Sequence, residues 1–371
     1  MKTLAVIGAS YLQRPLVEKA KALGHRVICF AWADGAVCAD LVDKFYPISI
    51  VEKDEILHVC QKERIDGVCT IASDVAAPTV AYVAQEMHLN GNDHQAAIRA
   101  NNKYLMRQAF SKARINCPRF ERITDKSNSL FSEWRFPLIV KPCDRSGSLG
   151  VSLARNLEEL QIGIDNALSL SFKHEAIVEE YIEGREISVE FISFKGKHYP
   201  LAITDKVTTG APHFVELEHH EPAELTSEQY DIIYANTCKA LDSLGVSEGA
   251  SHTEYKINAN GDIFIIELGA RMGGDFIGSD LVRLSTGYDF VKGVIEVALG
   301  DFIEPVFGRK ACSGVYFLSK ETERLLPYFD NPQIVPGVVQ MELFNRDLNC
   351  IHCSAERNGY MIYQSDKKVF L

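Results

Sequence analysis

No run of apolar residues in the 371-residue sequence approaches the roughly 20 that a membrane-spanning helix needs. The N-terminal residues are too few for a signal peptide, because an expected β-strand already begins at residue 4, so we expect a cytoplasmic protein. Basic residues are also outnumbered, 39 against 50 acidic ones, which gives a net charge of −11. Nucleic-acid binding needs a basic surface, and this composition therefore disfavours a nucleic-acid partner.

Closely spaced cysteines are scarce, although the sequence contains ten cysteines. Only Cys350 and Cys353 form a CxxC spacing, and no second pair accompanies them, which disfavours a zinc or redox site. The others are scattered and lie mostly in apolar runs, as expected of reduced core thiols. The sequence also lacks internal repeats and low-complexity linkers, so we expect its parts to pack as one body.

A chain of this length is too long to fold around one hydrophobic core, so we expect two or three domains. The first 95 or so residues alternate short apolar strands with helical segments, which predicts a parallel sheet with right-handed crossovers. Near residue 100 the pattern changes to α+β and, from about residue 305, to a β-rich tail. The expected strands are 4–7, 27–30, 67–71, 137–141, 176–182, 186–194 and 198–205, and the expected helices are 12–23, 52–64, 75–87, 226–244 and 285–299, with a helix capped by Asn101-Asn102 that runs to about residue 113.

Residues 252–268 predict a β-hairpin around Asn260-Gly261, the pair favoured in a two-residue type I′ turn. Counting outward from that turn places Glu254 opposite Glu267. The two carboxylates would then lie roughly 5 Å apart at Cβ, where like charges oppose strand pairing.

A cation is expected to relieve this repulsion. Mg²⁺ commonly binds one or two carboxylates together with substrate phosphates, so Glu254 and Glu267 are candidate magnesium ligands. The alternative is an exposed pair that Lys256 or solvent neutralises. Arg271 follows in a glycine-rich turn four residues after Glu267, and its guanidinium is suited to two-pronged contacts with a phosphoryl or carboxylate group.

An apolar strand at residues 137–141 ends in Lys141, and lysine is rarely buried without a partner. The loop that follows contains Ser146, Gly147 and Ser148, whose backbone N–H groups are suited to surround an anion. This is not a Walker loop, because the lysine precedes the glycines. A plain turn with a solvent-reaching lysine is the alternative.

Two further segments carry polar groups between expected strands. Residues 177–186 pass from an apolar strand through acidic residues and a glycine, where a carboxylate could accept ribose hydroxyls and strand-edge backbone could bind adenine. Residues 204–216 read as a loop, suited to a flap, in which His213 could contact a phosphate. Acidic hairpins and loop histidines are also common on plain surfaces.

The N-terminal strand ends at Gly8, where a dinucleotide-binding fingerprint would lie. Ser10 and Gln13 stand in place of its other two glycines, and only Asp34 suggests a ribose contact. A nicotinamide-dependent dehydrogenase is therefore disfavoured.

The order and spacing of these motifs resemble those of the ATP-grasp superfamily. The motifs are Lys141 with its Ser/Gly loop, the 179–186 segment, and Glu254, Glu267 and Arg271. The resemblance covers roughly residues 1–300, and the flap and the 267–275 run look most like the branch of L-amino acid ligases and carbamoyl-phosphate-synthase-like enzymes. It implies an N-terminal Rossmann-like domain (1–98), an ATP-grasp domain (99–304, with a small lobe near 116–183 and a large lobe at 184–304) and a C-terminal segment (305–371) packed on it.

The resemblance also implies roles for single residues. Those in an ATP site are Lys103 and Lys141 for the phosphates, Ser146, Gly147 and Ser148 in the anion loop, Glu179, Glu180 and Ile182 for adenine, and Glu186 for ribose. Glu254 and Glu267 would hold Mg²⁺ or Mn²⁺. Arg271, Lys141 and His213 are the candidate catalytic residues. One position departs from many relatives: Gly269 replaces an asparagine that acts as a further metal ligand, so backbone, water or phosphate would have to complete the ligand set.

The implied reaction is ATP-dependent ligation of small molecules. A carboxylate attacks the γ-phosphorus to give an acyl phosphate and ADP, an amine attacks the acyl carbon, and Arg271 stabilises the oxyanion. One alternative is a carboxylase-type enzyme that phosphorylates bicarbonate, although residues 144–150 lack the Asp-Gly-Lys-Gly arrangement of one such family. Another is a nucleotide-binding module without turnover. The sequence is compatible with a homodimer and names neither substrate.

Overall fold

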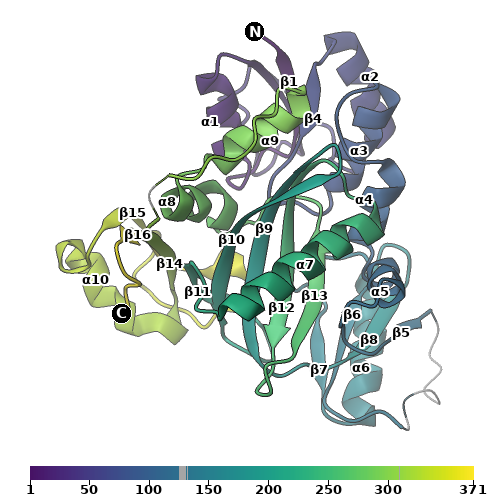
Figure 1. The fold of residues 1–371 in the computed structure, drawn as a ribbon, viewed down its shortest axis with the longest axis vertical. Coiled ribbons are helices and arrows are strands. Elements are labelled where there is room, and N and C mark those ends of the chain that lie inside the picture. Colours follow the sequence, from purple (N-terminus) through teal and green to yellow (C-terminus); the bar gives the residue numbers. More distant parts are fainter. Residues whose placement is uncertain (125–130, 132, 309) are drawn as a thin grey trace.

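The computed structural model describes residues 1–124, 131, 133–308 and 310–371 (Figure 1). The described residues form a parallel four-stranded sheet near the N-terminus, an antiparallel four-stranded sheet and an antiparallel eight-stranded sheet. The combination of α/β and α+β architecture is therefore confirmed.

The N-terminal sheet is covered on both faces, which explains its apolar strands. Its order is β3-β2-β1-β4, and every pair is parallel. Leu4 packs in one apolar cluster with Val291, whereas its neighbour Ala5 packs in another with Ile56. Successive strand residues face opposite sides, so each face needs its own helices. The elements are β1 (Thr3–Ile7), α1 (Arg14–Ala22), β2 (Arg26–Phe30), β3 (Lys44–Tyr46), α2 (Lys53–Glu63), β4 (Gly67–Cys69) and α3 (Ala77–Glu86).

Helix α9 (Phe290–Leu299) comes from far along the chain and packs against α1 and β4, as Figure 1 shows. The helix predicted near residues 285–299 is present as α9 but begins later than predicted. Helix α8 (Val282–Thr286) ends at Gly287, whose φ is +79°, and α9 begins after Asp289, whose side chain accepts a hydrogen bond from Lys292 N. A left-handed glycine and a new N-cap end one helix and start another.

Helices α4 (His94–Asn101) and α5 (Lys103–Lys112) lead from the N-terminal sheet into the second sheet region. The predicted cap is confirmed: Asn102 is extended, and its Oδ1 accepts a hydrogen bond from Leu105 N at 3.0 Å. This break makes Lys103 the first residue of α5.

The second sheet has the order β5-β8-β6-β7, and helix α6 (Leu157–Leu170) covers one face. Val140 and Val178 pack beneath α6, so their neighbours Lys141 and Glu179 point to the other face. The strands are β5 (Phe120–Ile123), β6 (Leu138–Pro142), β7 (Ser152–Ala154) and β8 (Ala176–Glu180).

The large sheet has the order β13-β12-β9-β10-β11-β14-β16-β15, and helix α7 (Ser227–Leu244) packs on one face. Ile187 and Val189 of β9 lie in the cluster beneath α7, so Glu190 points to the other face. The strands are β9 (Arg185–Phe194), β10 (Lys197–Thr208), β11 (Glu216–Glu221), β12 (Gly249–Ile257) and β13 (Ile263–Gly269).

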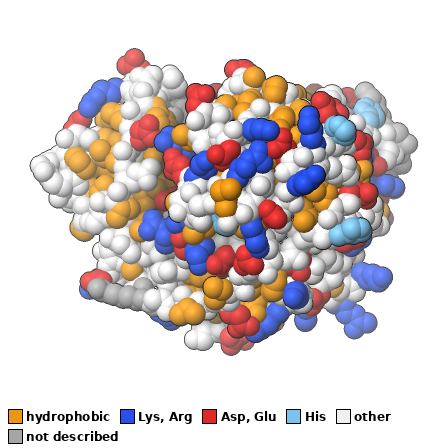
Figure 2. Space-filling model, turned by 90° about the horizontal axis from the view of Figure 1, so that it is seen from above, with side chains coloured by type: hydrophobic (Ala, Val, Ile, Leu, Met, Phe, Trp, Pro, Cys, Tyr) orange, Lys and Arg blue, Asp and Glu red, His pale blue; other side chains and the backbone are white. Residues whose placement is uncertain are grey.

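The C-terminal residues extend this same sheet rather than form a separate one. Strand β14 (Cys312–Leu318) pairs with β11, β16 (Gly359–Ser365) pairs with β14, and β15 (Val338–Leu343) lies at the edge. Short helices complete this part: η2 (Ile277–Leu281) before α8, then η3 (Lys320–Leu325), α10 (Leu326–Asp330), η4 (Pro332–Ile334) and η5 (Ser354–Glu356). No helix among the described residues is long and apolar enough to cross a membrane. Basic and acidic side chains are interspersed on the face seen in Figure 2.

The β12–β13 hairpin reaches the predicted register by an unpredicted route. The turn is longer than two residues, because Ile257 pairs with Ile263 and the Asn258 side chain accepts hydrogen bonds from Asn260 N and Asp262 N. The two-residue turn was therefore wrong. A register shift between Glu254 and Tyr255 then adds one residue on β13, so Glu254 still lies opposite Glu267, as predicted.

Candidate functional site

A cavity of about 470 Å³ is lined by residues from every part of the chain. Tyr11 comes from the N-terminal region, Lys141 from the second sheet, Glu254 from the large sheet and Cys353 from the C-terminal segment. All the residues predicted to form the site line this one cavity: Lys103, Lys141, Ser146, Gly147, Ser148, Glu179, Glu180, Ile182, Glu186, His213, Glu254, Glu267 and Arg271. The structure therefore brings them together, while their individual roles stay predictions.

Two buried lysines face the cavity from neighbouring elements. Lys103 Nζ donates to Glu267 Oε1 at 2.8 Å and to the Arg145 carbonyl at 2.6 Å. Lys141 Nζ lies 2.6 Å from Glu179 Oε2. Burial lowers the pKa of Lys141 against the opposing effect of Glu179. At Lys103 burial also acts to lower the pKa, but Glu267 together with Asp74 and Glu179 outweighs burial and raises it. Two ammonium groups in one cleft are suited to a polyanionic ligand.

The Glu179 carboxylate is already bound on both sides. Besides Lys141, it forms an ion pair with Arg107, whose Nε lies 2.5 Å from Glu179 Oε1. Although burial favours the neutral acid, Arg107 and Lys141 hold the pKa of Glu179 below its ordinary value. Sequence reasoning did not single out Arg107, which is fully buried on α5. Glu179 thus fixes the position of Lys141.

The Ser/Gly loop after β6 lies over the cavity in left-handed backbone conformations. Gly147 and Ser148 have φ values of +63° and +57°, and Ser146 also lines the cavity. The backbone therefore turns sharply here, and the N–H groups of such a turn can bind an anion.

The link between the small and large lobes passes beside the cavity. Glu180, Ile182 and Glu186 lie along it, from the end of β8 to the start of β9. Gly184 has φ of +158°, and a Cβ there would lie 2.2 Å from the Ile257 carbonyl oxygen. Only glycine therefore allows this close crossing of the link over the β12–β13 hairpin.

Each of the two facing carboxylates has its own buried lysine. Glu267 binds Lys103, and Glu254 Oε1 accepts from Lys206 Nζ at 2.6 Å. Lys256, the alternative neutralising group, instead has its Nζ 3.9 Å from Glu186 Oε2. Glu254 and Glu267 are thus neither simply exposed nor neutralised by solvent.

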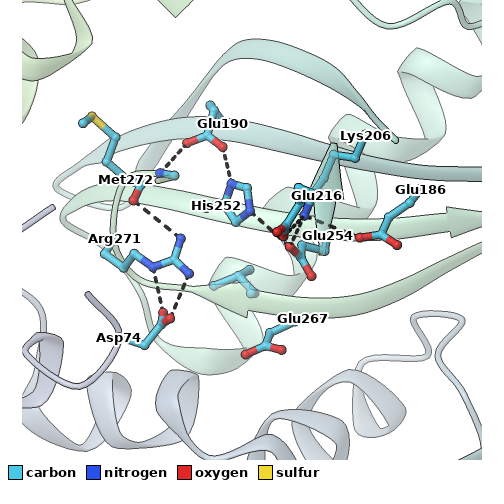
Figure 3. Close-up of polar contacts among 12 residues, drawn as sticks. Asp74, Glu186, Glu190, Lys206, Glu216, His252, Glu254, Glu267, Arg271 and Met272 are labelled. Carbon is cyan, nitrogen blue, oxygen red and sulfur yellow. Dashed lines mark hydrogen bonds and ion pairs between the residues drawn. The ribbon is translucent and has the colours of Figure 1, made fainter. Parts of the chain in front are cut away.

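Lys206 is another site residue that sequence reasoning missed, although it lies within the predicted flap segment. Strand β10 continues to Thr208, so Lys206 is a strand residue with a nearly buried side chain. Its Nζ lies 3.4 Å from Glu186 and 3.6 Å from Glu216, in addition to Glu254 (Figure 3). These carboxylates outweigh burial and hold the pKa of Lys206 well above its ordinary value.

A histidine on β12 joins the same network. His252 Nδ1 contacts Glu190, and His252 Nε2 lies 3.4 Å from Glu254 Oε1 (Figure 3). Although burial favours the neutral ring, Glu190 raises the pKa of His252 to about 9. Glu190 also accepts a hydrogen bond from Gly273 N at 3.0 Å. The alternation of His252 and Glu254 along one strand face was the sequence signal for this contact.

Arg271 is held by an aspartate of the N-terminal region. Its Nε and Nη2 donate to Asp74 Oδ1 and Oδ2, each at 2.8 Å (Figure 3). Although burial opposes the charged form, Asp74 raises the pKa of Arg271, which keeps the guanidinium charged.

Side chains of the C-terminal segment close another side of the cavity. The ring of His213 lies 4.6 Å from that of His352, centroid to centroid. Arg357 Nη2 donates to Asp275 Oδ2 at 2.8 Å and to the Glu216 carbonyl at 2.9 Å. Sequence reasoning assigned no role to this segment, because its contacts depend on the pairing of β14 with β11.

The place of a dinucleotide fingerprint is filled by protein atoms. Gln13 Oε1 accepts hydrogen bonds from Ser10 N and Ser10 Oγ, and a Cβ on Gly8 would lie 2.9 Å from the Gln13 side chain. Asp34 lies on the exposed surface. All ten cysteines are described residues with free thiols, including the exposed Cys350 and Cys353.

Residues 134–280 match the ATP-grasp domain family. The chain therefore contains an ATP-grasp domain, and the resemblance stated from its motifs is confirmed. A Bacillus subtilis protein, alanine–anticapsin ligase, is 29% identical over 245 residues, which cover 60% of this chain and 51% of that protein. The large chain of carbamoyl phosphate synthase from Campylobacter jejuni is 24% identical over 300 residues, which cover 77% of this chain and 27% of that protein. The aligned regions thus span about half or less of these relatives.

The fold as a whole is shared with solved ligase structures. The crystal structure of L-amino acid ligase from Bacillus licheniformis superposes with a TM-score of 0.80 at 22% identity, covering 99% of this chain and 94% of that one. Phosphoribosylglycinamide synthetase from Anaerococcus prevotii gives a TM-score of 0.77 at 21% identity with the same coverage. At these identities the likeness establishes the fold.

Proposed function

We propose that this protein is an ATP-dependent ligase that activates a carboxylate as an acyl phosphate and joins it to an amine. The observation that carries the proposal is the convergence of two buried lysines, two facing carboxylates and one arginine on a single cavity. Phosphoryl transfer asks a protein mainly for positioning and charge neutralisation, which these groups supply. The relatives named as ligases support the same reaction class.

ATP would lie between the second sheet and the large sheet. Lys103 and Lys141 would bind its phosphates, and the loop at Ser146–Ser148 would cover them. The backbone around Glu180 and Ile182 would bind adenine, because the Glu179 carboxylate is already bound to Lys141 and Arg107. Glu186 would accept the ribose hydroxyls.

The paired carboxylates fit a magnesium ion. Glu254 and Glu267 face each other across β12 and β13. Mg²⁺ commonly takes one or two carboxylates when phosphates supply other ligands, and this pair provides two. Among the described residues, no group of three His, Cys, Asp or Glu side chains is placed to hold a metal ion alone. Mg²⁺ or Mn²⁺ bound here would neutralise charge on the β- and γ-phosphates.

The reaction would proceed in two steps. A substrate carboxylate oxygen attacks the γ-phosphorus, the bond to the bridging oxygen breaks, and ADP leaves the acyl phosphate. An amine nitrogen then attacks the acyl carbon, the bond from that carbon to the phosphate oxygen breaks, and phosphate leaves. The amide is the product. Arg271 would stabilise the oxyanion of the second step, and Lys206, beside Glu254, would neutralise charge near the transferred phosphoryl group.

Water must be excluded while the acyl phosphate exists. The Ser/Gly loop covers one side of the cavity, and the segment after Thr208, which contains His213, lies against His352 of the C-terminal segment on another. Closure of these segments over ATP would shield the intermediate from hydrolysis.

The test is ADP and phosphate release from Mg·ATP across pooled amino acids, short carboxylates and bicarbonate, with Glu267→Gln as the control. Release that needs both a carboxylate and an amine, and is lost in the control, is the expected result. Release with bicarbonate alone would indicate the carboxylase-type reaction instead. ATP binding without release from any pool would contradict the proposed ligase and favour a nucleotide-binding module.

A further inference from the structure

The guanidinium of Arg271 has one edge committed and one edge left for a ligand. Both Nε and Nη2 donate to Asp74, while Nη1 reaches only the Met272 carbonyl at 3.5 Å. A planar guanidinium held by two parallel hydrogen bonds has a fixed orientation. Because Arg271 lines the cavity, the Nη1 edge is the one available to a reacting group.

Asp74 belongs to the loop after β4, and that loop is itself tied to the turn that carries Arg271. Ala72 N donates to the Met272 carbonyl at 3.1 Å, so a backbone hydrogen bond accompanies the ion pair. Ala72 adopts φ of +56°, a conformation that a residue with a side chain rarely takes. The loop after β4 therefore contacts the Arg271 turn twice, through the Ala72–Met272 hydrogen bond and the Asp74–Arg271 ion pair.

The ion pair also accounts for the glycine at position 269. A Cβ there would lie 2.6 Å from Asp74 Oδ1 and 3.2 Å from Arg271 Nε. The φ of Gly269 is not in the left-handed region, so its backbone does not require glycine. The space that a side chain at 269 would enter is occupied by the Asp74 carboxylate.

We propose that Asp74 is a positioning residue for Arg271, and that its carboxylate takes the place of the side chain missing at Gly269. This inference rests on the proposed ligase function. The N-terminal region thus contributes to the second chemical step without touching the reacting atoms: Asp74 holds the guanidinium so that Nη1 points into the cavity. The Asp74 carboxylate then occupies the space that a side chain at position 269 would fill.

Turnover of the full-length protein tests the positioning role. Asp74→Asn and Asp74→Ala should lower kcat by about 10- to 100-fold, the scale of a misplaced catalytic group, while the KM for ATP changes little. Because Asp74 acts through Arg271, adding Asp74→Asn to Arg271→Ala should lower kcat no further. Lys19→Ala is the matched control, since it breaks another ion pair between the N-terminal region and a later segment, Lys19–Asp289, away from the cavity. Additive losses in the double variant, or unchanged kcat in Asp74→Asn, would overturn the proposal.

Thermal unfolding tests whether the Asp74 carboxylate occupies the space at Gly269, and this measurement does not require a turnover assay. Gly269→Asn should lower the Tm in the wild-type background, because its Cβ meets the Asp74 carboxylate, and should lower it much less in the Asp74→Ala background. Equal losses in the two backgrounds would contradict the proposal. If the wild-type protein turns over no substrate pool, the ligase function fails, whereas this cycle still decides whether Asp74 occupies the space at Gly269.

Discussion

Each buried lysine of the cavity lies against a carboxylate: Lys103 against Glu267, Lys141 against Glu179 and Lys206 against Glu254. An ammonium group removed from water needs such a partner, and removal of one partner leaves the other uncompensated. The pairs therefore keep the site charged and ordered. When a polyphosphate binds, its oxygens can take over part of the charge compensation that these carboxylates provide.

Single substitutions in these pairs should sharply lower turnover. Lys141→Ala and Glu267→Gln are each expected to lower kcat by about 10²–10³-fold, as loss of one electrostatic contact in an active site does. Phosphate release with the substrate pair found for the wild type measures this. Lys197→Ala, which removes an exposed ion pair with Glu304, serves as the control. Turnover within twofold of the wild type in both site variants would contradict the assignment.

A buried acid outside the cavity predicts a pH dependence of stability. Glu221 is buried, and its carboxyl oxygens accept hydrogen bonds from Thr204 and Ser285. Burial raises the pKa of Glu221 to about 8 from 4.5. The folded protein therefore keeps this proton while the unfolded chain loses it, so the contribution to stability is full below pH 4.5 and declines as the pH rises towards 8.

Glu221→Gln should remove this decline, because the amide does not ionise. We expect the Tm of the variant, relative to the wild type, to rise between pH 4.5 and pH 8 by on the order of a few degrees. Thermal unfolding followed by circular dichroism across that range measures the difference. Glu224→Gln, at an exposed carboxylate three residues away, should show no such trend. A constant difference between Glu221→Gln and the wild type would contradict the prediction.

At the scale of elements, the β12–β13 hairpin and the link between β8 and β9 position the acidic half of the site. The hairpin holds Glu254 opposite Glu267 through a longer turn and a compensating extra residue, and the Ile266 carbonyl of β13 accepts a hydrogen bond from Arg107. The same arginine binds Glu179, so one buried side chain connects the hairpin to the end of β8. Gly184 lets the link cross close over the hairpin.

Two glycine substitutions distinguish the effect of a steric clash at the Gly184 crossing from the effect of backbone strain in an ordinary turn. Gly261→Ala has open space around its Cβ but φ of +86°, so we expect a loss of about 1–2 kcal/mol in the free energy of unfolding. Gly184→Ala places Cβ 2.2 Å from a backbone oxygen. It should therefore lower the free energy of unfolding by more than Gly261→Ala does, and it should raise the KM for ATP. Denaturant unfolding and ATP kinetics check both. A KM for ATP that is equal in the two variants would argue against the crossing as a determinant of the nucleotide site.

At the scale of the whole molecule, distant segments complete each layer. Helix α9 closes one face of the N-terminal sheet, and β14, β16 and β15 extend the large sheet beyond β11. The cavity takes its lining from all these parts, so neither end of the chain is independent of it.

Removal of residues 310–371 should therefore damage the protein globally. The truncation exposes the edge of β11, whose unpaired backbone groups favour edge-to-edge association, and it removes Arg357 from Glu216 and Asp275. We expect aggregation in size-exclusion chromatography and loss of a cooperative unfolding transition. A monodisperse truncated protein with wild-type ATP turnover would contradict this expectation.

The sequence by itself determined the succession of elements, the ATP-grasp motifs and many, but not all, of the residues that line the cavity. Apolar periodicity, the Asn102 cap and the spacing from Lys141 to Arg271 are local patterns, and local patterns follow from backbone and side-chain preferences along the chain. Even the facing of Glu254 and Glu267 was predicted, although by a turn that the structure does not contain.

Only the tertiary structure decided which charges meet. Asp74 and Arg271, the carboxylates around Lys206, and Arg357 between Glu216 and Asp275 are brought together by strand order and loop closure. These contacts join residues far apart in the sequence, where no periodicity specifies a partner. Gly269 shows the limit most clearly: read along the chain it is a missing ligand, whereas in space its place is taken by the Asp74 carboxylate from another part of the chain.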